Sequence, residues 1–296
     1  MGKESEMGYA HIDNLYKDTL ILQFKECYAM EKIHGTSAHV GWEGKEVHFF
    51  AGGEKHERFI ALFNTEALKA KFLEIFGTDC QRVTIYGEAY GGKLQGMSHT
   101  YGKDLKFIAF EVSHHGDSIE RFESVDRACE TVGKLGLEFV HFNKIPATIE
   151  AINAERDADS VQAVRNGIGS GKMREGVVLR PLFEVRLNNG ARVISKHKRA
   201  EFQETKTPRE VNPDKLQILR DAEKIAEEWV TPMRLEHVLQ KMPEATEISH
   251  TGAVIKAVVE DVCREASGEI VENKDARKAI GARAAKLYKS KVTKIS

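Results

Sequence analysis

The sequence Cys27-Tyr28-Ala29-Met30-Glu31-Lys32-Ile33-His34-Gly35-Thr36 ends an apolar run with a lysine, a histidine and a glycine. The apolar run predicts a β-strand that ends near Lys32. In an extended chain Lys32 and His34 project to the same face, and Gly35 lets the backbone turn sharply beside them. Met30 and Ile33 bound Lys32, and in a partly dry site the charged form of a lysine is disfavoured, which makes its amine a nucleophile. Taken alone, however, a Lys-x-His-Gly pattern is most often an ordinary strand end.

Further short apolar or alternating runs continue to about residue 200. The runs that we predict as strands include residues 27–33, 46–50, 82–88, 106–112, 175–181 and 191–198. Helix-like stretches lie between them at residues 59–76 and 124–135, the second with Ser124 as the expected N-cap. The mixture predicts an α+β fold with an antiparallel sheet rather than regular β-α-β alternation.

The pattern changes after Pro208 and Pro213. Residues 214–230, 234–241, 249–265 and 274–289 are charged, apolar-periodic and free of strand signals, which predicts helices. Each proline disfavours helix in the residue before it and removes a backbone donor, so the pair marks a boundary. We therefore predict a first domain of residues 1–207 and a small all-α C-terminal domain of residues 208–296.

The composition is that of a globular protein. Hydrophobic residues make up 41% of the 296 residues and charged residues 30%, which is too apolar for a disordered chain. No apolar run approaches the roughly 20 residues that cross a bilayer, and the first residues lack the apolar core of a secretory signal. The four cysteines are far apart and form no Cys-x-x-Cys pair. We therefore expect reduced thiols and a cytoplasmic location, in a cell or a virus-infected host.

Charge along the chain is balanced but unevenly distributed. With 44 basic and 45 acidic residues the net charge is -1, so a polyanionic partner must be met by a segregated basic surface. Basic residues cluster at 196–209 and at 283–294. Either cluster alone is most simply a solvated face or a frayed tail.

Four other runs carry carboxylates, lysines or an aromatic residue at strand ends. They are Tyr86-Gly87-Glu88, residues 107–112 with Phe110 and Glu111, residues 175–181 beginning at Glu175, and Lys196-His197-Lys198. Residues two apart in a strand share a face, so Lys196 and Lys198 lie together. Each of these side chains alone is most simply a cross-strand salt-bridge partner. In this order, the four runs resemble the motifs of the covalent nucleotidyltransferase superfamily of ATP-dependent ligases and mRNA capping enzymes.

Within that superfamily the chain looks like the RNA ligase 2 family, the double-strand RNA ligases of T-even phage and of kinetoplastid RNA editing. DNA ligases and capping enzymes usually show Asp in place of His34 and Arg in place of Ser37. Residues 229–239 are similar to the helical C-terminal domain of the phage-type enzymes, so the resemblance covers nearly the whole chain. Two positions depart from it: the phage enzymes carry Asn in place of Ser37, and their arginine after the second strand has no counterpart unless Arg58 serves.

The resemblance implies an antiparallel-sheet nucleotidyltransferase domain, of the ATP-grasp-like ligase adenylation kind, and chemistry in successive displacements at phosphorus. Lys32 would attack the α-phosphorus of ATP and form lysyl-AMP and pyrophosphate. AMP would then pass to the 5'-phosphate of RNA, and a neighbouring 3'-hydroxyl would displace AMP and seal the strand. Mg²⁺ is the implied metal, with Mn²⁺ as a substitute.

The resemblance also implies roles for individual residues. The role of His34 is open between phosphate contact and orientation of the lysine. Phe110 would stack on adenine, and Glu31 would lie against the adenine edge. The implied catalytic residues are Lys32, His34, Glu175, Lys196 and Lys198. The implied nucleotide contacts are Glu31, Ile33, Glu88, Phe110, Lys196 and Lys198, and the implied metal ligands are Glu88, Glu111 and Glu175.

The predicted function is ATP-dependent sealing of 3'-OH/5'-phosphate nicks in duplex RNA, or in an RNA-containing duplex, by a monomer. Recognition would rest on the A-form shape and a limited set of phosphate contacts, with the helical domain as the clamp. The alternatives within the superfamily are a DNA ligase, a single-strand RNA ligase and a GTP-dependent capping enzyme. A nucleic-acid-binding protein that keeps the fold without catalysis is the alternative of another class, although Glu175 and Lys196 are both present.

Overall fold

The computed structural model describes residues 8–78, 80, 82–116, 120–187, 190–203, 222–270 and 272–295. These residues divide into two compact units, one of residues 8–12 and 20–197 and the other of residues 13–19 and 198–295. The predicted boundary between residues 207 and 208, with Pro208 and Pro213, lies outside the described residues.

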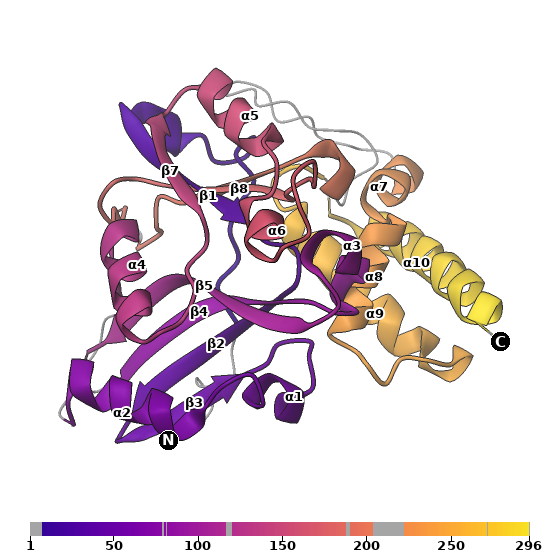
Figure 1. Ribbon diagram of the computed structural model, residues 1–296. Helices are drawn as coiled ribbons and strands as arrows, with labels where there is room; N and C mark the ends of the chain where they lie inside the picture. The colour runs from indigo at the N-terminus through magenta and orange to yellow at the C-terminus, as the bar shows by residue number, and fades with distance from the viewer. Residues whose placement is uncertain are drawn as a thin grey trace. The chain divides into compact units, whose positions relative to one another are not determined.

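Two sheets form the framework of the first unit (Figure 1). The larger sheet has the order β3-β2-β4-β5-β6, and all of its neighbouring strands are antiparallel. The smaller sheet has the order β7-β1-β8-β9, with β1 antiparallel to both β7 and β8. The strands are β1 Glu26–Lys32, β2 Thr36–Glu43, β3 Glu46–Phe50, β4 Arg82–Gly91, β5 Leu105–His115, β6 Glu120–Phe122, β7 Phe142–Pro146, β8 Gly176–Arg180 and β9 Ser195–Lys198. This arrangement confirms the predicted antiparallel α+β class.

Short helices connect the strands of this unit. The helix predicted for residues 59–76 is divided, because the Asn64 side chain accepts a hydrogen bond from Ala67 N and starts a new helix. Ser124 lies at the predicted N-cap of its helix, without a side-chain cap bond. The helices are α1 His56–Ile60, α2 Thr65–Phe76, α3 Ser98–Tyr101, α4 Val125–Lys134, α5 Ile149–Asp157 and α6 Val161–Arg165, with 3-10 turns at Leu20–Gln23 and Leu94–Gly96.

The two faces of the larger sheet have different roles. Val40, Trp42 and Ile85 are buried, and the Trp42 ring stacks on Phe72 of α2 with centroids 5.8 Å apart. The register pairs Ser37 with Glu88 and His39 with Tyr86. Since side chains alternate between faces, these four residues share the face opposite to Val40 and Trp42. That polar and aromatic face carries part of the candidate site.

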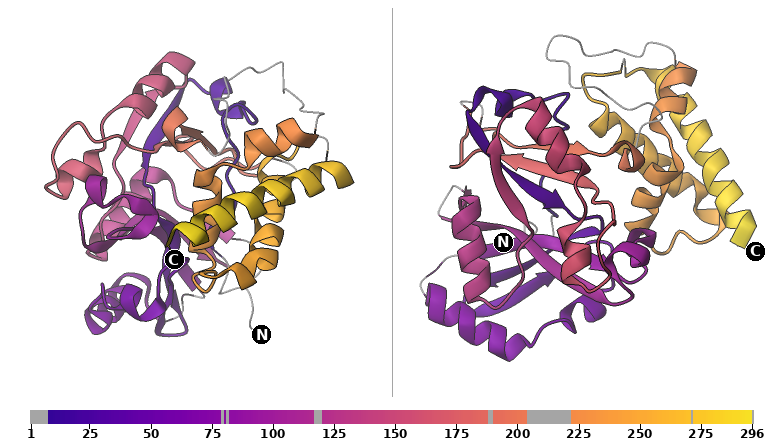
Figure 2. Two further views of the ribbon diagram at one scale, coloured as in Figure 1. Left: turned by 90° about the vertical axis from the view of Figure 1, so that its right-hand side faces the viewer. Right: turned by 45° about the horizontal axis from the view of Figure 1, so that its top comes forward.

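The second unit is helical throughout its described elements. Its helices are α7 Ala222–Trp229, α8 Pro232–Gln240, α9 Thr251–Glu265 and α10 Lys274–Ile295, with 3-10 turns at Ala200–Phe202 and Ile248–His250. Figure 2 shows α10 alongside the other helices of this unit, and residues from all four share one apolar core. Inside this core, Arg234 donates from Nε to Trp229 O at 2.8 Å and pairs with Asp261 at 2.5 Å. The prediction of an all-α C-terminal part is thereby confirmed.

None of the helices in the described ranges combines the length and the apolar character that a membrane crossing requires.

Two buried histidines make the stability of the first unit depend on pH. Burial, together with nearby Arg82, lowers the pKa of His39 to about 4, and burial with Arg156 lowers the pKa of His197 to about 4. A histidine in an unfolded chain has a pKa of about 6.5, so the unfolded state binds more protons between these values. The contribution of these two histidines to the free energy of unfolding is therefore fully present above about pH 6.5, and it is lost as the pH falls towards 4.

We expect each histidine to reduce the free energy of unfolding by about 2 kcal/mol between pH 7 and pH 5. Denaturant titration at both pH values measures this loss. The variant His39→Gln removes one of the two protonations and should show a smaller loss, whereas His99→Gln changes an exposed side chain and serves as the control. An unchanged pH dependence in His39→Gln would contradict the assignment.

Candidate active site

Lys32 and His34 share one buried carboxylate. Lys32 is the last residue of β1 and pairs with Gly176 of β8, which places Glu175 beside it. The Lys32 Nζ atom lies 3.0 Å from Glu175 Oε2, and His34 Nδ1 lies 3.2 Å from the same oxygen. The Glu175 side chain is only 2% exposed, whereas that of Lys32 is 23% exposed. A lysine that is held by a buried carboxylate and still reaches solvent is suited to meet an incoming reactant.

The turn after Lys32 is fixed by side chains of the larger sheet and its connections. Glu88 Oε1 accepts a hydrogen bond from Gly35 N at 3.0 Å, and the Tyr101 hydroxyl accepts one from His34 N at 3.3 Å. A Cβ atom at Gly35 would lie 2.2 Å from the backbone oxygen of Ala89, so only glycine fits. Glu88, predicted from sequence as a site residue, thus binds the backbone of Gly35, the residue that follows His34.

Glu31, predicted to lie against the adenine edge, has its side chain in the interior of the first unit. Its buried carboxylate accepts hydrogen bonds from Ser160 Oγ at 2.6 Å and from the backbone N–H groups of Val161 and Gln162 at 3.0 and 3.3 Å. The carboxylate is therefore used at the start of α6, where it satisfies backbone donors that a helix leaves unpaired. A contact of Glu31 with the adenine edge would have to come from its backbone.

Ile33 has a comparable constraint. Its side chain is 4% exposed and belongs to the core, so a nucleotide contact at this position would also involve the backbone.

The predicted lysine pair lies on β9, which neighbours β8 in the smaller sheet. Lys196 is 9% exposed, and Lys198 is the last residue of the strand. His197 lies between them and contacts Asn153 Oδ1 at 2.8 Å and Arg156 at 2.9 Å. Since successive side chains in a strand point to opposite faces, Lys196 and Lys198 lie on the face opposite to His197.

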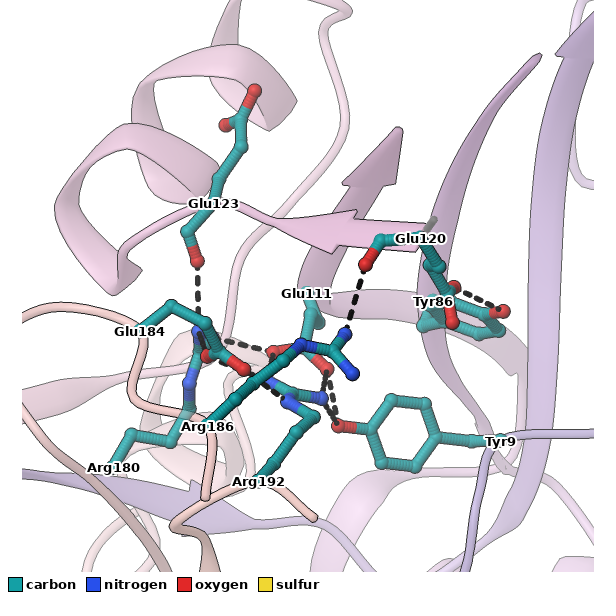
Figure 3. Close-up of polar contacts among 9 residues, drawn as sticks. All are labelled: Tyr9, Tyr86, Glu111, Glu120, Glu123, Arg180, Glu184, Arg186 and Arg192. Carbon is teal, nitrogen blue, oxygen red and sulfur yellow. Dashed lines mark hydrogen bonds and ion pairs between the residues drawn. The ribbon is translucent and has the colours of Figure 1, made fainter. Parts of the chain in front are cut away.

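Glu111, predicted as a metal ligand, is held by two arginines. Its carboxylate is 1% exposed and forms ion pairs with Arg180 at 2.7 Å and Arg192 at 2.6 Å (Figure 3). Burial alone would raise the pKa of Glu111, but Arg180 and Arg192 outweigh it and hold the pKa below its ordinary value. A carboxylate whose oxygens are neutralised by two guanidinium groups has little capacity left for a metal ion.

Phe110 and Tyr9 pack together on the same side of the larger sheet. The two rings meet edge to face, with centroids 5.0 Å apart, and the Tyr9 ring is 5.1 Å from that of Tyr86. The backbone N–H of Tyr9 donates to Ser37 Oγ at 3.3 Å, and Ser37 pairs with Glu88. The predicted stacking residue thus has an aromatic neighbour that comes from the start of the chain.

The remaining predicted metal ligands are Glu88 and Glu175. Within the described ranges no three side chains of the His, Cys, Asp or Glu type form a group that could hold a metal ion by themselves. Mg²⁺ usually keeps several waters and is bound through one or two carboxylates together with substrate phosphates. Glu88 and Glu175 would suit a Mg²⁺ site of this type, in which the phosphates of the nucleotide and water supply the other ligands.

Sequence reasoning missed several residues that shape this site. Tyr9 is far in sequence from every motif run, and no sequence signal connects it with Phe110. Arg180 lies inside the run 175–181 and is a visible charge in an apolar strand, but the sequence does not show that it pairs with Glu111. Arg58, considered as a substitute for the missing arginine, forms a surface ion pair with Glu54 at 3.1 Å.

Comparison with known proteins supports the same family. A model of the family described as RNA ligase matches residues 25–198. No curated protein sequence matches the chain. Solved structures of Naegleria gruberi RNA ligase are similar in fold. One variant with ATP and Mn has 14% sequence identity and a TM-score of 0.50, and the match covers 68% of this chain and 58% of that one.

Another structure of the Naegleria enzyme, a variant without ligand, has 15% identity and a TM-score of 0.49, with 67% of this chain and 56% of that chain covered. The chain thus matches little more than half the length of these structures. The family model, in contrast, spans Lys32, Glu88, Glu175, Lys196 and Lys198. By this match over more than half of its length, the chain belongs to the RNA ligase family.

Proposed function

We propose that this protein is an ATP-dependent RNA ligase whose first intermediate is AMP bound covalently to Lys32. The observation that carries the proposal is the position of Lys32 Nζ, held 3.0 Å from buried Glu175 at the end of β1. Two further lysines, Lys196 and Lys198, lie on β9, which neighbours β8 in the sheet that also contains β1. A Naegleria RNA ligase of similar fold contains ATP and Mn, which agrees with this choice of nucleotide and metal.

The first step is a displacement at the α-phosphorus of ATP. The amine of Lys32 forms the N–P bond while the bond to pyrophosphate breaks, so the lysine must lose a proton and be aligned with the phosphorus. Glu175 Oε2 accepts a hydrogen bond from Lys32 Nζ and therefore orients it. Such reactions depend mainly on alignment and on neutralisation of charge, because the protein can offer little further covalent help.

Positive charge for the phosphates comes from the β9 lysines. Lys196 and Lys198 act as point charges on one strand face, and His34 adds a further contact or orients Lys32. Glu88 and Glu175 would hold a Mg²⁺ ion that arrives with ATP, and Mn²⁺ would replace it. When bound, this ion supplies additional neutralisation of phosphate charge. Phe110 is proposed to stack on adenine, with Glu31 and Ile33 contributing backbone contacts.

The proposed substrate is a nick in duplex RNA or in an RNA-containing duplex. Residues 208–296, the proposed helical domain, would hold the duplex, and α10 supplies exposed basic residues that include Lys278, Lys286 and Lys289. Contacts of this kind are made with phosphates and weaken with salt. The alternatives are sealing of DNA nicks or of single-stranded RNA ends by the same lysine chemistry. The protein is proposed to act as a monomer.

Replacement of the nucleophile tests the first step. Wild-type protein incubated with α-labelled ATP and Mg²⁺ should retain label after denaturation, and Lys32→Ala should retain none because the N–P bond cannot form. Lys144→Ala is the control, since Lys144 lies on neighbouring β7 and pairs only at the surface with Glu26. Equal labelling of wild type and Lys32→Ala would contradict the proposal.

Removal of two charges from α10 tests the proposed duplex contact. The double variant Lys286→Gln/Lys289→Gln should weaken binding of nicked duplex RNA, with a salt dependence reduced by about two phosphate contacts. Its lysyl-AMP formation should stay normal. Lys241→Gln/Lys256→Gln removes the same charge from the residue after α8 and from α9, and should bind as the wild type does.

Equal losses in both double variants would show that only net charge matters, and would remove α10 from the proposed interface. Nicked DNA and single-stranded RNA, assayed in parallel, separate the alternatives. Faster sealing of either than of nicked RNA would replace the proposed substrate.

A further inference from the structure

Arg192, which lies outside the motif runs, is the centre of a polar network (Figure 3). Its Nε donates to Glu184 at 2.5 Å, and its two terminal nitrogens donate to Glu111 at 2.6 and 2.9 Å, to Glu184 at 3.0 Å and to the Tyr9 hydroxyl at 2.8 Å. These five bonds use all N–H donors of a guanidinium group. The central carbon of this guanidinium group, Arg192 Cζ, also lies 3.5 Å from the centre of the Phe122 ring.

Arg180 completes the network from β8. It pairs with Glu111 at 2.7 Å and with Glu184 at 3.1 Å, and it donates to the backbone oxygen of Glu123 at 2.7 Å. Two guanidinium groups thus face two carboxylates, and the Tyr9 hydroxyl both donates to Glu111 and accepts from Arg192. Burial would lower the pKa of Arg192, but Tyr9, Glu111 and Glu184 outweigh it and raise the pKa. The two guanidinium groups and the two carboxylates balance in charge, and every N–H donor of Arg192 is hydrogen-bonded, which makes the network stiff.

The network joins the elements that carry the proposed nucleotide contacts. Glu111 directly follows Phe110 on β5, and Tyr9 packs edge to face against the Phe110 ring. Arg180 ends β8, the strand that begins next to Glu175. Arg192 lies three residues before β9, which carries Lys196. One guanidinium group thus links β5, which carries Phe110, to the connection between β8 and β9.

We propose that Arg192 is a positioning residue for ATP, because it sets the distance between Phe110 on the larger sheet and Lys196 on the smaller one. This inference rests on the proposed ligase function. Arg192 touches neither the reacting atoms nor Lys32, and it acts through Glu111, Glu184 and Tyr9. Loss of the network separates contacts to adenine from contacts to phosphate, so ATP binds less tightly before any chemistry begins. Such a change raises KM more than it lowers kcat.

The variant Arg192→Lys tests this role. Lysine keeps the charge, but its three donors radiate from one nitrogen and cannot bridge two carboxylates as the planar guanidinium does. The control is Arg186→Lys, because exposed Arg186 lies on the same connection and over the same Phe122 ring, yet among the described residues its guanidinium group donates to the backbone oxygens of Glu120 and Gly190 and to no carboxylate. KM for ATP and kcat of lysyl-AMP formation are measured on the full chain, together with the melting temperature.

We expect Arg192→Lys to raise KM for ATP about tenfold, with a smaller loss in kcat, and Arg186→Lys to match the wild type. A lower melting temperature with an unchanged KM would overturn the proposal and leave Arg192 a purely structural residue. Absence of lysyl-AMP from the wild type would instead overturn the ligase function itself.

Tyr9→Phe keeps the test decisive if Arg192→Lys does not fold. This variant retains the ring against Phe110 and removes only the hydroxyl between Glu111 and Arg192. A KM for ATP raised about threefold supports the positioning role. An unchanged KM in Tyr9→Phe overturns it in that case.

Discussion

The site depends on one buried carboxylate, that of Glu175, which holds Lys32 and His34 through a single oxygen. An unpaired carboxylate at this depth would be costly, so the two basic side chains are drawn to it and their positions are fixed. The antiparallel pairing of β1 with β8 brings the carboxylate to the lysine. The larger sheet contributes from the other side, because Glu88 binds the backbone of Gly35 in the turn between β1 and β2.

Three buried glutamates each bind a different part of this region. Glu31 binds the start of α6, Glu175 binds Lys32 and His34, and Glu111 binds Arg180 and Arg192. Each would destabilise the fold if its partners were lost, since a buried charge without a counter-charge costs several kcal/mol. β8 has Glu175 just before its start and Arg180 at its end, so the strand is attached to the rest of the unit at both ends.

Much of this fold and part of the site could be predicted from sequence, because the relevant signals are local. The strand that ends at Lys32 and the lysine pair on β9 follow from apolar runs and from two-residue periodicity. The role of Glu111 could not be predicted, since its partners Arg180 and Arg192 reach it only in the folded chain. Local signals also failed at Asn64, where a capping side chain interrupts an otherwise continuous helical pattern.

The most direct test of the central claim locates the covalent nucleotide on the chain. Wild-type protein incubated with ATP and Mg²⁺ would be digested, and its peptides examined by mass spectrometry under conditions that preserve a lysine–phosphorus bond. The account predicts AMP on the peptide that contains Lys32 and on no other lysine, Lys196 and Lys198 included. AMP on a different residue, or unmodified peptides from protein that has consumed ATP, would contradict it.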